Sequence, residues 1–229
     1  MSPLAPASIT VYCSSSPVVD PTFVRVASQV GAMIGSSGRQ LVYGGGSLGL
    51  MGEIARSCRG AGGRVVGIIT ERLREAELFD PDNDENIVVA TMRERKMLLE
   101  QRGDAFLILP GGLGTLEEFF EILVGRLLGE HAKPIALVNP ADPMDAPMPY
   151  EDDSGQSPAG YWSPLLAMFD HMVHNRFMKP GVRTLFAVHA EPGAAIEALE
   201  QMASAPDTVL DDADLLPGVN RRAPEDAQS

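Results

Sequence analysis

The chain is poor in cysteine and in basic residues, and each shortage excludes classes of protein. Among its 229 residues are two cysteines, Cys13 and Cys58, too few for a disulfide framework. Reduced thiols in a cytoplasm are the simpler interpretation, and Cys13 is expected to be a packed thiol. Only 18 basic residues stand against 31 acidic ones, which gives a formal net charge of -13. Because nucleic acids and anionic membranes bind basic surfaces, neither is expected as a partner.

Several chemical signatures are also missing. No run is apolar over the ~20 residues that a membrane-spanning helix needs, and the start of the chain lacks the features of a signal peptide. There is no G-x-x-x-x-G-K-[ST] phosphate loop, no convincing Ser–His–Asp set and no internal repeat. His171 and His174 share an expected helix with no third ligand nearby in sequence, so no metal site is expected.

Short apolar runs alternate with segments of helical periodicity. We expect strands at residues 8–13, 40–43, 65–69, 87–90, 105–109, 135–138 and 185–188. We expect helices at residues 23–38, 50–59, 92–102, 116–128, 161–177 and 194–203. This alternation predicts the α/β class: a doubly wound (Rossmann-like) parallel sheet with helices on both faces.

The length of the chain predicts a single domain, over residues 1–206. Within it, the acidic stretch 75–86 has little periodicity and is expected to be a loop. Residues 139–160 are rich in Pro, Asp, Met and Gly and are expected to form a surface insertion. Residues 207–229 are expected to be an acidic tail with a disordered end.

The most informative stretch is the sequence P-G-G-L-G-T-L-E-E at residues 110–118. It follows an expected buried strand and opens an expected helix. A glycine-rich turn in that place aims backbone N–H groups outward, and the positive end of the helix dipole helps them hold a phosphate. Unlike most phosphate loops, this one supplies carboxylates within a turn of the glycines. A phosphate site with an acid beside it predicts chemistry on a nucleotide.

Glu118 has two interpretations. Thr115 to Glu118 is itself a T-x-x-E capping box, in which Glu118 caps its own helix. A carboxylate beside a bound phosphate and sugar would instead stabilise a developing ribosyl cation. The two roles are compatible, because a cap would fix the position of the carboxylate.

A second glycine-rich turn follows the strand expected at 40–43. Gly44, Gly46 and Gly49 fit the dinucleotide pattern G-x-G-x-x-G, with Glu71 near the distance expected for a ribose-binding acid. That pattern normally follows the first strand, whereas here it follows the second. The turn therefore either binds a nucleotide or is a tight turn that needs positive φ. An NAD-dependent oxidoreductase built on these glycines is one alternative function, and a non-catalytic nucleotide-binding protein of the same fold is another.

Basic residues gather at the start of the helix expected at 92–102. Thr91 and Glu94 form a capping box, and Arg93, Arg95 and Lys96 lie in or near the first turn. Cations there oppose the helix dipole by roughly 0.3–1 kcal/mol each. A bound anion would offset that cost, since a guanidinium holds phosphate in a bidentate way. The alternative is a solvated basic patch paired with the acidic residues before it.

Together these motifs resemble the LOG (lonely guy) family of cytokinin riboside 5'-monophosphate phosphoribohydrolases, often labelled lysine decarboxylases. The family pattern P-G-G-x-G-T-x-x-E is met in full at 110–118, and Y-G-G-G-x-x-G-L-M-G is met at 43–52. The element M-H-E-R-K is present at 92–96 with Arg93 in place of histidine. The first turn C-G-S-S is present as C-S-S-S at 13–16.

The resemblance implies hydrolysis of the N-glycosidic bond of an N6-substituted adenosine 5'-monophosphate to free base and ribose 5-phosphate. Arg95 and Glu118 match the catalytic pair. The other matched residues, implied to bind nucleotide or phosphate, are Gly111, Gly112, Gly114, Thr115, Gly45, Gly46, Lys96, Ser15 and Met92. The implied partner is a nucleoside 5'-monophosphate, with no cofactor or metal, and the protein is expected to be a cytoplasmic homodimer. No motif for a pyridoxal Schiff base supports the lysine decarboxylase label.

Overall fold

The computed structural model describes residues 5–76, 79–143 and 160–205. Most of the expected insertion at 139–160 and all of the expected tail at 207–229 lie outside the described residues. Among the described helices, none combines the length and the apolar character that crossing a bilayer requires.

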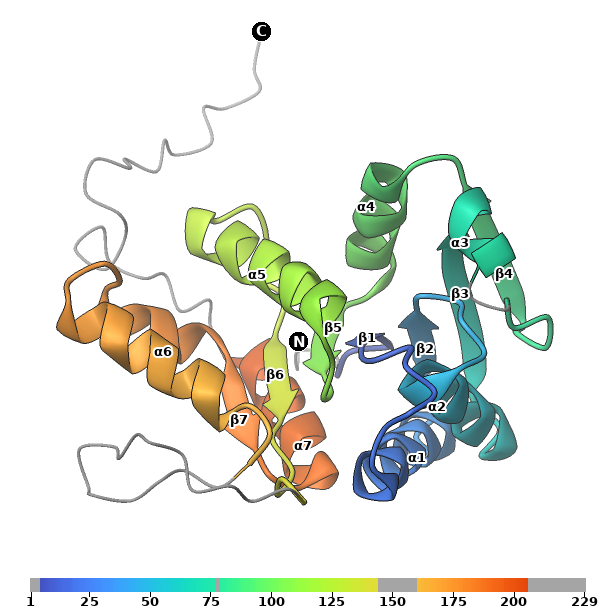
Figure 1. The fold of residues 1–229 in the computed structure, drawn as a ribbon, viewed down its shortest axis with the longest axis horizontal. Helices are drawn as coiled ribbons and strands as arrows, with labels where there is room; N and C mark the ends of the chain where they lie inside the picture. The colour runs from blue at the N-terminus through green and yellow to red at the C-terminus, as the bar shows by residue number, and fades with distance from the viewer. Residues whose placement is uncertain (1–4, 77–78, 144–159, 206–229) are drawn as a thin grey trace, which may run out of the picture.

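The described strands form one parallel sheet in the order β4-β3-β2-β1-β5-β6-β7 (Figure 1). Their bounds are β1 Ser8–Tyr12, β2 Gln40–Tyr43, β3 Arg64–Thr70, β4 Glu85–Val89, β5 Ala105–Ile108, β6 Ile135–Val138 and β7 Ala187–His189. The strand order reverses between β1 and β5. The loops that follow these two strands therefore diverge to opposite faces of the sheet and leave a crevice at its carboxyl edge.

Helices cover both faces of the sheet, which confirms the predicted α/β class. Their bounds are α1 Pro21–Ser36, α2 Gly49–Gly60, α3 Glu71–Ala76, α4 Met92–Arg102, α5 Leu113–Leu128, α6 Ser163–His174 and α7 Pro192–Ser204, with a 3-10 turn at Pro180–Leu185. α1, α2 and α7 pack on one face, and α4, α5 and α6 on the other (Figure 1). Alternate residues of each strand pack into the hydrophobic cores on the two faces of the sheet. Val11 of β1 packs with α1, α2 and α7, and Tyr12 packs into the core on the other face.

Two differences between the expected and the observed elements lie near the carboxyl edge of the sheet. Residues 75–86 are not one loop, because α3 ends at Ala76 and β4 begins at Glu85. The helix expected from residue 116 begins at Leu113, with Gly112 as its N-cap. Its first turn carries a glycine and an exposed leucine, so hydrophobic periodicity could not mark it.

Candidate active site

A cavity of about 360 Å³ opens at the carboxyl edge of the sheet, at the reversal point of the strand order. Its lining residues come from the loop after β1 and from the helices that follow β2, β3, β4 and β5. They are Cys13, Ser14, Ser15, Ser16, Met51, Leu73, Met92, Arg95, Gly112, Gly114, Thr115 and Glu118. The fold thus brings most of the residues that the sequence singled out into one cavity.

The N-terminus of α5 forms one wall. The N–H groups of Leu113, Gly114 and Thr115 belong to the first helical turn and have no acceptor inside the helix. In the described part of the chain, no backbone carbonyl takes their protons either. Gly112 and Gly114 are exposed, and a Cβ on either would meet no atom within 4 Å. Open amides at the positive end of a helix of 16 residues can bind an anion.

Gly111 holds this turn in place rather than lining the cavity. It is buried, and a Cβ there would collide with Oγ1 of Thr115, so only glycine permits the close approach. The Gly111 carbonyl accepts a hydrogen bond of 2.7 Å from the hydroxyl of Tyr161. The turn is therefore fastened from both sides.

Arg95 is buried, with 5% of its surface exposed, and its guanidinium is held by backbone. Nε donates to the Ile68 carbonyl at 3.0 Å, and Nη2 donates to the Gly44 carbonyl at 3.3 Å. Both carbonyls lie at the carboxyl edge of the sheet. The predicted capping box is confirmed: Thr91 accepts from the Glu94 N–H, and Glu94 accepts from the Thr91 N–H. The guanidinium is thereby presented to the cavity in a fixed orientation.

Glu118 meets Arg95 from the opposite wall. Its carboxyl oxygen Oε1 lies 3.6 Å from Arg95 Nη1, and the residue is 7% exposed. Since α5 begins at Leu113, Thr115 is the third helical residue and cannot be an N-cap. The capping-box interpretation of Thr115 and Glu118 is therefore wrong. Thr115 and Glu118 instead lie one helical turn apart and line the same cavity.

Besides Gly111, three of the residues matched to nucleotide binding lie outside the cavity lining: Lys96, Gly45 and Gly46. Lys96 Nζ lies 2.5 Å from Glu117 Oε1 and 3.1 Å from Glu121 Oε1. The hydrogen bond with Glu117 raises the pKa of Lys96. These contacts connect α4 to α5. Gly45 accepts a backbone hydrogen bond from Asp80, and Gly46 forms a β-bridge with Phe79. The second glycine-rich turn is therefore covered by residues 79–80.

The start of α2 is not an open anion site. The N–H groups of Leu50 and Met51 both donate to the Ser14 carbonyl, at 3.0 and 3.3 Å. Gly49 has φ +59° and lies so close to the Ser16 carbonyl that a Cβ would collide with it. Glu71, at the start of α3, is exposed and is not among the residues that line the cavity. The G-x-G-x-x-G match is thus a tight turn, and the dinucleotide alternative loses its binding element.

Sequence reasoning missed contributors to the cavity of two kinds, side chains on short or unmarked turns and backbone carbonyls. Leu73 lines it from α3, a six-residue helix too short to show periodicity. The carbonyls of Gly44 and Ile68 hold Arg95, but a backbone acceptor leaves no signal in side-chain identity. The glycine at 44 was the available hint, because a Cβ there would collide with Arg95 Nη2.

The cysteines are packed thiols. Burial raises the pKa of the Cys13 thiol far above its usual range, and the charge of Glu118 adds to the effect. Burial likewise raises the pKa of Cys58 to about 11. Neither residue forms the thiolate that a nucleophile requires near neutral pH. The expectation that Cys13 is packed is confirmed.

We expect iodoacetamide near neutral pH to leave both cysteines unmodified in the native protein and to alkylate both after unfolding. Intact-mass spectrometry reads the number of adducts directly. Rapid alkylation of native Cys13 would show that its thiol is exposed and ionised, contrary to the buried position found here.

The chain is similar in sequence to a described protein family and to several named enzymes. A family model described as "Possible lysine decarboxylase" matches residues 51–199. A protein of Mycobacterium tuberculosis named cytokinin riboside 5'-monophosphate phosphoribohydrolase is 46% identical over 133 residues, which cover 58% of this chain and 71% of the relative. Proteins of the same name from Rhodococcoides fascians and Arabidopsis thaliana are 36% and 34% identical, over 85% and 88% of this chain and 89% and 81% of theirs.

Solved structures agree on the fold. The molybdenum cofactor carrier protein of Chlamydomonas reinhardtii matches with a TM-score of 0.60 at 20% identity, over 86% of this chain and 98% of its own. The molybdenum cofactor binding protein of Rippkaea orientalis matches with a TM-score of 0.57 at 20% identity, over 85% and 94%. At this identity the match shows a shared fold and leaves function to the site itself.

Proposed function

This chain belongs to the family described as "Possible lysine decarboxylase", and we propose that it is a cytokinin riboside 5'-monophosphate phosphoribohydrolase, the name that its relatives carry. Its substrate is an N6-substituted adenosine 5'-monophosphate, and its products are the free base and ribose 5-phosphate. The observation that carries the proposal is the meeting of Arg95 and Glu118 in one cavity with the open N-terminus of α5. Among the described lining residues there is no lysine, so the decarboxylase description finds no amine there for a Schiff base.

The first step is to anchor the phosphate. The N–H groups of the first turn of α5, together with the hydroxyl of Thr115, bind its oxygens, and the exposed glycines 112 and 114 let it approach the backbone. Ser15, on the loop after β1, adds a hydroxyl from the facing wall. Anchoring the phosphate fixes the sugar, so that binding energy is used to orient the bond that breaks.

Cleavage of the glycosidic bond then leaves positive charge on the ribosyl carbon. Glu118 lies one turn below Thr115, where its carboxylate faces a sugar held by that phosphate. The carboxylate stabilises the oxocarbenium-like transition state or takes a proton from the attacking water. Arg95, fixed by the Ile68 and Gly44 carbonyls, orients the carboxylate from the side. The exposed Met92 provides an apolar surface at the cavity rim for the base.

The experiment that tests this function is a turnover assay. The protein is incubated with AMP and with isopentenyladenosine monophosphate, and the free base is separated by chromatography. Base and ribose 5-phosphate should be released in equal amounts. Binding of AMP with release of neither would favour the non-catalytic nucleotide-binding alternative. Binding of NAD in preference to AMP would favour the oxidoreductase.

Gly44→Ala is expected to lower kcat by about 100-fold without touching either member of the catalytic pair. A Cβ at this position collides with Arg95 Nη2, so the guanidinium must leave the position from which it faces Glu118. Because φ of Gly44 is not positive, alanine brings little backbone strain, and the thermal midpoint should fall only slightly. Steady-state kinetics and thermal melting measure the two effects. Gly60→Ala, where a Cβ meets nothing within 4 Å, is the matched control. Wild-type kcat in Gly44→Ala would contradict the role given to Arg95.

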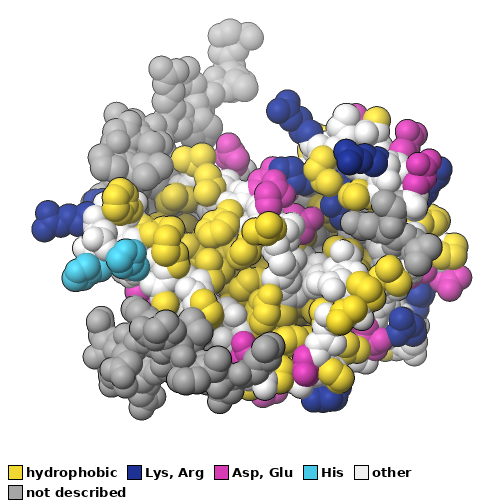
Figure 2. Space-filling model, in the orientation of Figure 1, with side chains coloured by type: hydrophobic (Ala, Val, Ile, Leu, Met, Phe, Trp, Pro, Cys, Tyr) yellow, Lys and Arg dark blue, Asp and Glu magenta, His cyan; other side chains and the backbone are white. Residues whose placement is uncertain are grey.

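We further propose that the protein is a cytoplasmic homodimer, as the family resemblance implies. Figure 2 shows apolar side chains gathered over α5 and α6. They include the exposed residues Val124, Leu128 and Met168 and the walls of an apolar groove of about 210 Å³ between these helices. An exposed apolar surface of this kind suits contact with a second copy of the chain.

A further inference from the structure

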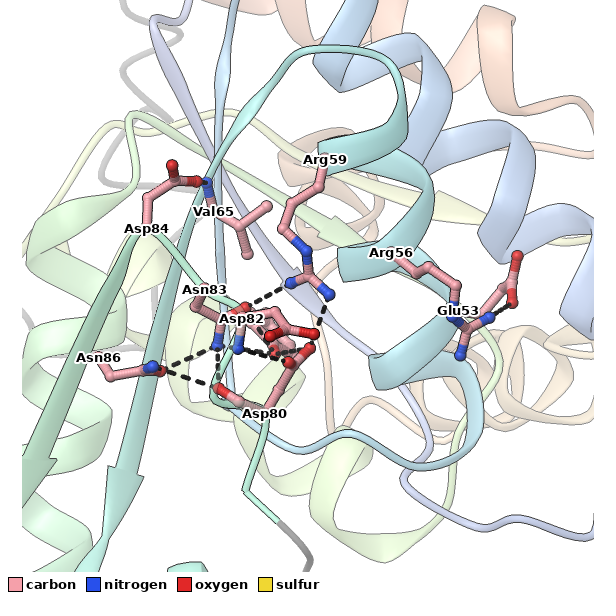
Figure 3. A network of polar contacts seen from close by, with 10 residues as sticks. Glu53, Arg56, Arg59, Val65, Asp80, Asp82, Asn83, Asp84 and Asn86 are labelled. Atoms are coloured by element: carbon pink, nitrogen blue, oxygen red, sulfur yellow. Dashed lines mark hydrogen bonds and ion pairs between the residues drawn. The ribbon is translucent and has the colours of Figure 1, made fainter.

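A polar network centred on the buried Asp80 lies beside the second glycine-rich turn, outside the cavity (Figure 3). We call it the Asp80 network; its members are Tyr43, Arg59, Asp80, Asn83 and Asn86. Asp80, 4% exposed, accepts from Arg59 Nη2 at 3.1 Å and from the Tyr43 hydroxyl at 3.5 Å. Arg59 Nη1 also donates to Asn83 Oδ1 at 2.8 Å. In Figure 3, Arg59 extends from α2 to both partners.

The Asp80 network fixes the backbone of residues 80–86 against the sheet. The amide nitrogens of Asn83 and Asn86 both donate to the Asp80 carbonyl, at 3.2 Å each. These amides pack on β3, where a Cβ on Gly67 would lie 2.6 Å from Asn83 Nδ2. The side-chain charge of Asp80 is thus paired, and its main chain is held in one conformation.

The main chain of Asp80 is hydrogen-bonded to the second glycine-rich turn. Its N–H donates to the Gly45 carbonyl at 3.1 Å, and its neighbour Phe79 forms a β-bridge with Gly46. Gly45 has φ +79°, a conformation that only glycine adopts readily. The peptide just before it supplies the Gly44 carbonyl, which accepts from Arg95 Nη2 at 3.3 Å. If Gly45 were released, that peptide could rotate and Arg95 would lose an acceptor.

The Arg59–Asp80 ion pair therefore serves to fix the geometry of its surroundings more than to stabilise the fold. Asp80 is buried and the Arg59 side chain is partly exposed. An ion pair removed from water adds little net stability over an apolar pair of the same volume, but it can fix one arrangement of its surroundings. Nor is the acidic segment an open cation site: Arg59 supplies the positive charge, and Asp84 accepts from the Val65 N–H at 2.8 Å. Through the Asp80 N–H, the Asp80 network contacts the glycine-rich turn at residues 44–46, whose Gly44 carbonyl holds Arg95.

We propose that Arg59 and Asp80 are positioning residues that set the orientation of Arg95 through the Gly44–Gly45 peptide. Their effect on turnover rests on the hydrolytic function proposed above. Neither residue lines the cavity. They act by keeping the Gly44 carbonyl turned toward Nη2, so that Nη1 stays directed at Glu118.

Kinetics of Asp80→Asn and of the milder Arg59→Lys test the proposal. We expect kcat to fall by about 10-fold to 100-fold, as for a misplaced catalytic group, with KM nearly unchanged because the phosphate site on α5 is intact. Arg56→Gln is the matched control: Arg56 lies on the same helix and pairs with Glu53 on its exposed side (Figure 3), so kcat should not change. Wild-type kcat in both test variants would overturn the proposal.

A double-mutant cycle separates positioning from a general structural effect. If Asp80 acts through Arg95, Asp80→Asn should cause no further loss of kcat in an Arg95→Ala background. If Asp80→Asn lowers kcat by the same factor with and without Arg95, the two residues act independently and the proposal is wrong.

A spectroscopic readout that needs no turnover distinguishes this proposal from the proposed function. The buried Arg95 Nε–H donates a hydrogen bond to the Ile68 carbonyl and should therefore give a slowly exchanging NMR signal in isotope-labelled protein. We expect the signal to shift and exchange faster in Asp80→Asn and to stay unchanged in Arg56→Gln. An unchanged signal in Asp80→Asn would overturn the positioning role, even in an active enzyme. A changed signal in Asp80→Asn, combined with a wild-type protein that releases no base, would support positioning and overturn the hydrolytic function instead.

Discussion

Glu118→Gln is expected to lower kcat by about 1,000-fold while the affinity for AMP changes little. The amide has nearly the size of the carboxylate, so the first turn of α5, which holds the phosphate, is undisturbed. It carries no negative charge to stabilise the ribosyl cation and cannot take a proton from water. Because Glu118 is 7% exposed, solvent cannot replace the lost charge. The effect therefore belongs to the transition state and not to binding.

Two measurements on the same variant check this expectation. Chromatography of the released base gives kcat, and calorimetric titration gives the affinity for AMP. Glu121→Gln is the matched control, since Glu121 lies on the same helix, is half exposed and pairs with Lys96. It should keep kcat near the wild-type value. Full turnover by Glu118→Gln would remove this residue from the reaction.

Arg95→Lys is expected to lower kcat by about 100-fold, although it keeps the positive charge. The guanidinium places Nε on the Ile68 carbonyl, Nη2 on the Gly44 carbonyl and Nη1 beside Glu118 at the same time. A single ammonium cannot reach all three directions, so the carboxylate loses its fixed neighbour. A buried carbonyl left without a donor also costs about 1–3 kcal/mol of stability.

The expected result for Arg95→Lys is therefore a loss of kcat together with a lower thermal midpoint. Arg102→Lys controls for the chemical change itself, because Arg102 lies on the same helix in a partly exposed ion pair with Glu85. It should leave both quantities close to wild type. If lysine supports turnover as well as arginine does, the three-way geometry of Arg95 is not what the reaction needs.

The sheet and the location of the site could be predicted because their signals lie in side chains. Apolar runs such as residues 135–138 mark buried strands, and the glycines at 111, 112 and 114 mark a strand-to-helix turn. In a doubly wound sheet the glycine-rich turns that follow the strands open at one edge, and the family resemblance implied that Arg95 and Glu118 act there as a pair. The structure confirms that they line one cavity.

What could not be predicted depends on backbone and on packing between helices. The start of α5 at Leu113 was missed because glycine leaves no hydrophobic pattern, and the capping role of Glu118 was wrong for that reason. The holding of Arg95 by two carbonyls is invisible in a sequence. Lys96 lies between carboxylates of α5 only because α4 and α5 pack at this distance, which no local motif encodes.

The central claim is that the N-terminus of α5 holds the phosphate while Glu118 faces the ribosyl carbon. A crystal structure of the slow variant Glu118→Gln with AMP tests it most directly. The account predicts phosphate oxygens within about 3 Å of the N–H groups of the first turn of α5, with the C1' atom of the ribose turned toward residue 118. A phosphate seated at the start of α2, or a ribose turned away from residue 118, would contradict it.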